Sequence, residues 1–241
     1  KGVLNNKPMI FMPRHGKKHS TAPHDINYRA NMWALKELDV SHVLAINAVG
    51  GIDDELAPGA VSIPDQIIDY TYGRDHTFYS QYGDDSEEEK REIEKCLPLV
   101  LDHVDFTAPY DIAWRECVLG VAKRYANISS ADSETGDALF HLMEGGVYGC
   151  TQGPRLETAA EIMRLKRDGC DMVGMTGMPE ASLARELDLP YACIAISVNW
   201  AAGLSDEKIT FELIKSQLDS RMKDIKKIIE DLGANINNYL Y

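Results

Sequence analysis

Two polar side chains in the second half of the chain have the chemistry to bind a flat, nitrogen-rich ring. Asn199 comes directly after an apolar, strand-like run that begins at Tyr191, and a polar amide at such a strand end needs hydrogen-bond partners. Glu157 stands in T-Q-G-P-R-L-E-T, where a glycine and a proline are expected to open a helix whose first turn holds this carboxylate. A carboxylate that accepts N1–H and an amide that bonds O6 and N7 would together grip a purine with an oxygen at position six.

A helix cap is the competing interpretation of Glu157, because the helix dipole stabilises a carboxylate in the first turn. The interpretation as a base-binding group makes a sharper prediction. Adenine carries no proton on N1, so a buried acceptor there would stay unpaired, at a cost on the order of several kcal/mol. Both interpretations of Glu157 fit the sequence.

Arg14 and His15 are the first candidate anion-binding residues. They lie in P-R-H-G, directly after a predicted strand at Met9–Met12. Strand ends are where α/β proteins place ligands, and a guanidinium beside an imidazole can bind phosphate oxygens. A surface Arg-His pair without a ligand is the simpler alternative.

Two further strand ends carry weaker signals. Asn47 begins N-A-V-G-G, in which the glycines would let backbone N–H groups approach an anion closely, although a tight turn explains them equally well. Met175 and Thr176 end another predicted strand, where the thioether could lie under a sugar and the hydroxyl could contact phosphate. A methionine of the hydrophobic core is the alternative for Met175.

The composition describes an ordinary globular protein of 241 residues with 44% hydrophobic and 26% charged residues. The net charge of −13 disfavours nonspecific binding to nucleic acid or to an anionic membrane. Five cysteines are scattered without metal-binding spacing, which predicts free thiols, no metal site and a reducing, cytoplasmic location. No membrane-spanning run and no signal peptide are visible in the sequence.

Short apolar runs that alternate with helical patterns predict an α/β fold, with a mixed β-sheet covered by helices. No linker or repeat divides the chain, so we expect one domain over residues 1–241. An acidic segment, Tyr72–Leu97, is expected to be a solvated helix or loop insertion. The predicted strands are Met9–Met12, Val43–Asn47, Val61–Ile63, Gln66–Tyr70, Val147–Thr151, Asp171–Met175 and Tyr191–Val198; the predicted helices are Ile26–Leu38, Tyr110–Tyr125, Leu156–Arg167, Pro179–Leu187 and Phe211–Leu232.

A co-linear series of motifs resembles the purine nucleoside and methylthioadenosine phosphorylases. The series comprises R-H-G-K-K-H-S, I-N-Y-R-A-N-M-W-A-L-K-E-L, the Gly-Gly turn, Q-G-P-R-L-E-T-A-A-E and M-T-G-M-P-E-A-S-L-A-R-E, and it covers nearly the whole chain. The resemblance implies a single α/β domain with a distorted, barrel-like mixed sheet surrounded by helices. It also implies phosphorolysis, in which inorganic phosphate attacks C1′ of a nucleoside and expels the base, without a metal or any other cofactor.

The resemblance also implies roles for individual residues. Arg14, His15, the backbone at Ala48 and Thr176 would hold phosphate, while Met175 would support the ribose and Asn47 would lie where the sugar and phosphate contacts meet. Glu157, Asn199, Trp200 and Ala201 would line the base site, with Asn199 as the catalytic residue that stabilises the leaving purine. His103 would reach the neighbouring subunit's site in a homotrimer.

Departures from the methylthioadenosine branch indicate the substrate. That branch carries two aspartates where this chain has Asn199 and Ala201, and a small residue where Glu157 stands. The sequence therefore predicts a 6-oxopurine nucleoside phosphorylase that favours S-methyl-5'-thioinosine. The alternatives are methylthioadenosine or general inosine and guanosine phosphorylase activity, or a non-catalytic nucleoside-binding protein. The family's N-terminal strand and glycine-rich phosphate loop are missing from these 241 residues, so we expect either that the sequence is truncated or that phosphate binding is impaired.

Overall fold

The computed structural model describes residues 1–5, 7–79, 103–126 and 140–239 of the chain. The strands are β1 (Gly2–Leu4), β2 (Lys7–Met9), β3 (Val43–Gly51), β4 (Val61–Ser62), β5 (Gln66–Asp69), β6 (Leu142–Met143), β7 (Val147–Cys150), β8 (Met172–Gly174) and β9 (Tyr191–Trp200). The helices are α1 (Tyr28–Glu37), α3 (Ile112–Ala126), α4 (Ala159–Arg167), α5 (Glu180–Glu186) and α6 (Phe211–Tyr239), with short 3-10 turns at Pro23–Asp25 and Asp54–Leu56.

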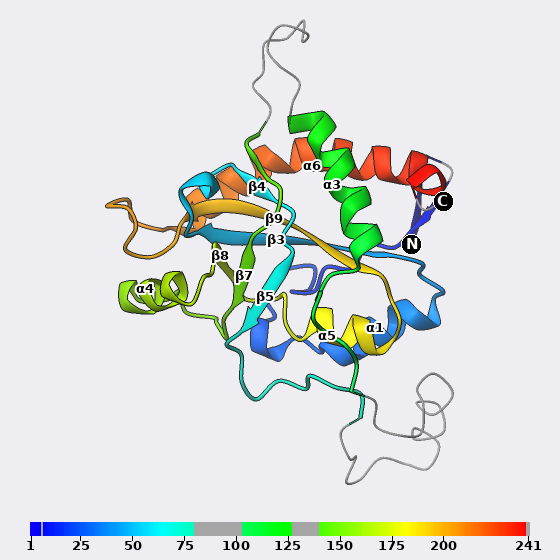
Figure 1. Cartoon of the computed structure of the whole chain (residues 1–241), viewed down its shortest axis with the longest axis horizontal. Coiled ribbons are helices and arrows are strands. Elements are labelled where there is room, and N and C mark those ends of the chain that lie inside the picture. The colour runs from blue at the N-terminus through cyan, green and yellow to red at the C-terminus, as the bar shows by residue number, and fades with distance from the viewer. Residues whose placement is uncertain (6, 80–102, 127–139, 240–241) are drawn as a thin grey trace, which may run out of the picture.

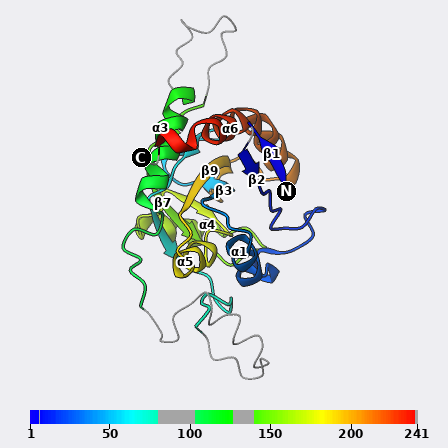
Figure 2. The ribbon, with the colours of Figure 1, turned by 90° about the vertical axis from the view of Figure 1, so that its right-hand side faces the viewer.

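Seven of the strands form a curled, mixed sheet in the spatial order β5-β7-β8-β3-β9-β4-β6. β1 and β2 pair separately. β3 runs parallel to β9 on one side and antiparallel to β8 on the other. α3 and α6 lie on one side of the central strands, and α1 and α5 lie on the opposite side (Figure 1, Figure 2). The predicted α/β class and the helix-covered mixed sheet are therefore confirmed.

The central strand β9 is buried on both faces, which explains its nearly continuous apolar sequence. Because side chains alternate along a strand, every second residue packs toward α3 and α6, and the residues between them pack toward α1 and α5. The first set is Ala192, Ile194 and Ile196, and the second is Tyr191, Cys193 and Ala195. On α3, Trp114, Val118 and Val121 form the predicted buried face.

The boundary of the first predicted strand is wrong in a way that matters for the site. The strand predicted at Met9–Met12 ends at Met9 and pairs only with β1, while Ile10 and Met12 pack against the core outside any strand. Their apolar character therefore reflects packing and not pairing in the main sheet. The acidic segment predicted at Tyr72–Leu97 lies mostly outside the described residues, and residues 72–79 form neither helix nor strand.

The strand predicted at Val43–Asn47 is longer than expected, and Gly50 and Gly51 lie within it instead of in a turn. β3 continues to Gly51, with a register shift between Val49 and Gly50. A Cβ atom on Gly51 would lie 1.9 Å from the carbonyl oxygen of Leu56. Glycine is therefore needed here for close packing of backbone within a strand, and not to end it.

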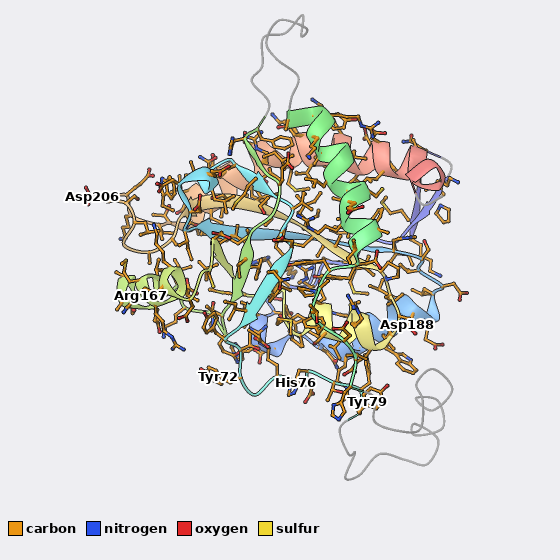
Figure 3. All side chains as sticks on the ribbon, viewed as in Figure 1. Tyr72, His76, Tyr79, Arg167, Asp188 and Asp206 are labelled. Atoms are coloured by element: carbon orange, nitrogen blue, oxygen red, sulfur yellow. The ribbon has the colours of Figure 1, made fainter. Side chains whose placement is uncertain are left out.

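Arg167, Asp188 and Asp206 lie at the outside of the fold (Figure 3), and all three are exposed. Cys117, Cys150, Cys170 and Cys193 are buried free thiols. Within the described ranges, no helix is both long enough and apolar enough to cross a membrane.

Candidate active site

Arg14 is at the centre of a largely buried polar network. Its Nε and Nη2 atoms donate to the two carboxylate oxygens of Glu180, at 2.9 and 2.6 Å, and its Nη1 donates to Asn47 Oδ1 at 2.6 Å. Burial opposes the charge of the guanidinium, but attraction by Glu180 outweighs this penalty and raises the pKa of Arg14 above its ordinary value. Arg14 therefore stays a cation.

Asn47 and Thr176 extend this network with further donors. Asn47 lies on β3 with only 2% of its surface exposed, and the Thr176 hydroxyl lies 3.4 Å from both Asn47 Oδ1 and Arg14 Nη1. Among the described residues, no partner accepts a hydrogen bond from the buried Asn47 Nδ2. A buried, unpaired N–H group beside a guanidinium and a hydroxyl makes a donor-rich environment, which suits an anion.

His15 and Ala48 flank the same network in the chain. His15 is half-buried, and its Nδ1 lies 2.9 Å from the carbonyl oxygen of Thr21. The Nδ1 atom must carry a proton to donate to this carbonyl, which leaves Nε2 to face other groups. Burial lowers the pKa of His15, although the bond to Thr21 opposes the shift. Ala48 is exposed on β3 directly after Asn47.

Glu157 is not part of the cap of α4. This helix begins at Ala159, and its capping box is formed by Thr158 and Glu161, so the prediction that Glu157 lies in the first helical turn is wrong. The hydroxyl of Thr151 donates instead to Glu157 Oε1 at 2.6 Å. Glu157 is half-buried and held by a neutral donor, which leaves its second oxygen available for another donor.

Asn199 lies inside β9, two residues before the point where the chain leaves the sheet, and not after the strand as predicted. It is 6% exposed and donates from Nδ2 to the carbonyl oxygen of Trp200 at 2.7 Å. It pairs with Gly50, on which a Cβ atom would lie 3.3 Å from Asn199 Nδ2 and 3.3 Å from Val173. The missing side chain at Gly50 therefore makes room for the Asn199 amide.

The segments that carry Glu157 and Asn199 meet on the α4 side of the sheet. Val173 and Ala201 share one hydrophobic cluster with Ile162 and Leu165 of α4. At Gly203, which has a positive φ of 82°, a Cβ atom would lie 2.4 Å from the Cβ of Ala159. The loop after β9 thus touches the start of α4, two residues from Glu157.

The remaining predicted residues have different surroundings. Met175 lies against the turn before α4, since a Cβ on Gly153 would lie 2.5 Å from Met175 Sδ. Trp200 is half-buried and Ala201 is buried, both beside Asn199. His103 is exposed, and its predicted role in a neighbouring subunit stays a prediction. Within the described ranges, no three His, Cys, Asp or Glu residues gather as a metal site would require.

Two buried charged residues of this region were not assigned a role from the sequence. Glu180, the partner of Arg14, occurs in the quoted motif M-P-E-A-S-L-A-R-E, in which no spacing distinguishes it from Glu186. Arg74 donates to the carbonyl oxygens of Gln152, Met175 and Met178 at 2.8, 2.9 and 2.6 Å, and so joins the segments after β7 and β8. It follows Gly73 in the segment interpreted as an insertion, so no pattern pointed to it.

Comparison with known proteins defines the class. A family model described as "Phosphorylase superfamily" matches residues 1–233. The probable S-methyl-5'-thioinosine phosphorylase of Xanthomonas campestris pv. campestris is 45% identical over 233 residues, which cover 96% of this chain and 82% of that protein. The 6-oxopurine nucleoside phosphorylase of Pyrococcus furiosus is 42% identical over 228 residues, which cover 95% and 77% of the two chains.

A solved structure agrees with these sequence relatives. The methylthioadenosine phosphorylase from Schistosoma mansoni in complex with adenine superimposes with a TM-score of 0.80 at 30% identity, covering 94% of this chain and 76% of that one. The chain therefore belongs to the phosphorylase superfamily. Within that class it is an enzyme of the nucleoside phosphorylase type, a pentosyltransferase.

Proposed function

We propose that this enzyme catalyses the reversible phosphorolysis of a 6-oxopurine nucleoside in purine salvage, and that it favours S-methyl-5'-thioinosine. The products would be hypoxanthine and 5-methylthioribose 1-phosphate. The observation that carries the choice of base is the Glu157 carboxylate, which Thr151 holds at 2.6 Å and which the α4 cap does not use. The names of the relatives from Xanthomonas and Pyrococcus support the same base class.

In this proposal, the second oxygen of Glu157 accepts N1–H of the base. The Asn199 amide NH2 donates to O6, and its Oδ1 accepts a hydrogen bond from a protonated N7. Trp200 and Ala201 lie beside it. Adenine would place an unprotonated N1 against the carboxylate, and the acceptor–acceptor contact would disfavour it. Ala201 adds no side-chain acceptor for an exocyclic amino group.

The network around Arg14 is proposed as the phosphate site. Arg14, His15 and Thr176 would contact phosphate oxygens together with the backbone at Ala48, and the buried, unpaired Nδ2 of Asn47 supports an anion nearby. Met175 would lie against the ribose.

The reaction follows from these two ends of the site. A phosphate oxygen forms a bond to C1′ while the bond from C1′ to N9 breaks, and the electron pair of that bond leaves with the purine. The transition state resembles an oxocarbenium ion, so phosphate below the sugar stabilises the cation. Asn199 stabilises the negative charge that develops on the purine. Phosphate is then a co-substrate, and these residues suffice without another cofactor.

The assembly and location belong to the same proposal. We propose that residues 1–241 act as one domain of a cytoplasmic homotrimer, in which His103 reaches the neighbouring subunit's site. The exposure of His103 and the free, buried thiols support this picture.

Turnover tests the proposal directly. The protein is incubated with S-methyl-5'-thioinosine, with and without inorganic phosphate, and hypoxanthine and the sugar phosphate are quantified. Hypoxanthine release that needs phosphate, with a higher kcat/KM than for S-methyl-5'-thioadenosine or inosine, is expected. Binding without turnover would instead identify a nucleoside-binding protein, and a preference for the thioadenosine would contradict the assignment of Glu157 and Asn199.

A further inference from the structure

Glu180 is a buried carboxylate that joins Arg14 of the proposed phosphate site to Tyr191. It is the first residue of α5 and 5% exposed. Its two oxygens accept from Arg14 Nε and Nη2, and Oε1 also accepts from the Tyr191 hydroxyl at 2.9 Å. A buried ion pair is weak evidence for a contribution to stability, because desolvation offsets the attraction. Its geometry, however, has a direct consequence for Arg14.

The guanidinium of Arg14 is planar, and Glu180 occupies one of its edges with two parallel hydrogen bonds. This arrangement directs the remaining Nη1 atom toward Asn47 and Thr176. Residues 10–13 form neither helix nor strand, although Ile10 and Met12 pack against the core. Glu180, which lies on α5, therefore holds one edge of the cation in place.

Tyr191 fixes Glu180 in turn. Its ring is 2% exposed at the start of β9 and stacks on Tyr110, with ring centroids 6.1 Å apart and planes inclined by 11°. Burial raises the pKa of the Tyr191 hydroxyl, so it remains a protonated donor. The hydroxyl thus meets the same carboxylate oxygen that accepts from Arg14 Nη2.

We infer that Glu180 and Tyr191 are positioning residues for phosphate, acting through the edge of Arg14 that they leave free. The inference rests on the proposed function and names residues that would not touch phosphate themselves. It requires that their removal weakens the use of phosphate while the use of the nucleoside stays nearly unchanged.

Two variants test this inference in the full chain. Tyr191→Phe removes only the hydroxyl and keeps the stacked ring, and we expect KM for phosphate to rise by about fivefold. Glu180→Gln puts an amide NH2 against guanidinium N–H groups, and we expect a larger rise, of more than about tenfold. In both variants KM for S-methyl-5'-thioinosine should change by less than about twofold.

Glu186→Gln is the matched control. Glu186 ends the same helix and accepts from the backbone N–H of Phe78 at 2.7 Å, outside the Arg14 network. The Glu186→Gln variant is expected to change thermal stability without changing the ratio of KM for phosphate to KM for S-methyl-5'-thioinosine. The shift in Tm caused by inorganic phosphate gives a second readout, which should shrink in Tyr191→Phe and Glu180→Gln and persist in Glu186→Gln.

The outcomes separate this inference from the proposed function. Wild-type turnover that does not need phosphate would overturn the proposed function. Normal phosphate-dependent turnover of the wild type, combined with an unchanged phosphate KM in Tyr191→Phe, would overturn the inference alone. Equal rises of both KM values would also overturn it, because they would indicate a structural role. If Glu180→Gln does not fold, Tyr191→Phe decides.

Discussion

Glu157→Gln is the substitution that most directly tests the proposed recognition of the base. Glutamine has the shape of glutamate, and its amide oxygen can still accept the hydrogen bond that Thr151 donates at 2.6 Å. Its NH2 group would then replace the carboxylate oxygen that is proposed to face N1 of the purine. A donor in this place suits adenine and opposes the protonated N1 of hypoxanthine.

The size of the effect follows from the bond that is lost. A hydrogen bond to a charged group contributes about 1.5–3 kcal/mol. Each ~1.4 kcal/mol is a factor of ten, so kcat/KM for S-methyl-5'-thioinosine should fall roughly 10- to 150-fold. The same change offers adenine a neutral hydrogen bond of about 1 kcal/mol, so kcat/KM for S-methyl-5'-thioadenosine should rise by about fivefold.

Initial rates with both nucleosides at saturating phosphate give the ratio of the two kcat/KM values. Glu161→Gln is the matched control, because Glu161 lies in the same segment but closes the α4 capping box and pairs with Arg155. It should lower stability and leave the ratio of the nucleosides unchanged. An unchanged ratio in Glu157→Gln, or an equal change in both variants, would refute the role of Glu157.

Two further predictions concern stability. Gly51→Ala should lower the free energy of unfolding by about 3 kcal/mol in urea denaturation, because its Cβ would lie 1.9 Å from the Leu56 carbonyl oxygen. Gly120→Ala in α3, where the new Cβ would meet no atom within 4 Å apart from its own helix backbone, should be neutral or stabilise by up to about 1 kcal/mol; equal losses in both variants would contradict this reasoning. Burial lowers the pKa of His15 and His42. Near pH 6 the unfolded chain therefore binds more protons than the folded protein does, and the free energy of unfolding should decrease as the pH drops below about 6.5. Tm should therefore decrease between about pH 7.5 and 5.5, and His42→Gln should reduce that slope, whereas an unchanged slope would show that His42 does not contribute.

The sequence predicts the fold well where one pattern determines one structure. The apolar run from Tyr191 correctly predicts a buried strand, because helices cover both faces of β9 and require apolar side chains on each. The spacing of Trp114, Val118 and Val121 predicts α3 because these side chains fill one continuous face. The prediction from sequence fails at Ile10 and Met12, since apolar residues can pack on a core without pairing in a sheet. It also fails at Gly51, because the need for glycine arises from Leu56, which lies close only in the folded chain.

The site shows a similar division. Residues with distinctive chemistry at strand ends, such as Arg14 and Asn199, could be proposed from sequence, and the structure places Arg14, Asn47 and Thr176 in one hydrogen-bonded network. Their supporting partners could not be found in this way. Thr151 and Glu180 are common residue types without special spacing, and their importance comes only from the contact that each makes across the fold.

The pairing of β3 with β9 explains how one rigid unit can serve both ends of the proposed site. Asn47 on β3 lies in the Arg14 network, while Gly50, three residues further, pairs with Asn199 of β9. Tyr191, at the other end of β9, supports Glu180 and through it Arg14. The two strands pair in parallel along nearly their whole length, so a change of register would displace the groups for the base and for phosphate together. If Glu157 binds the base as proposed, substitutions there, on a connecting segment, should alter selectivity with less disturbance of the proposed phosphate site than substitutions within β9.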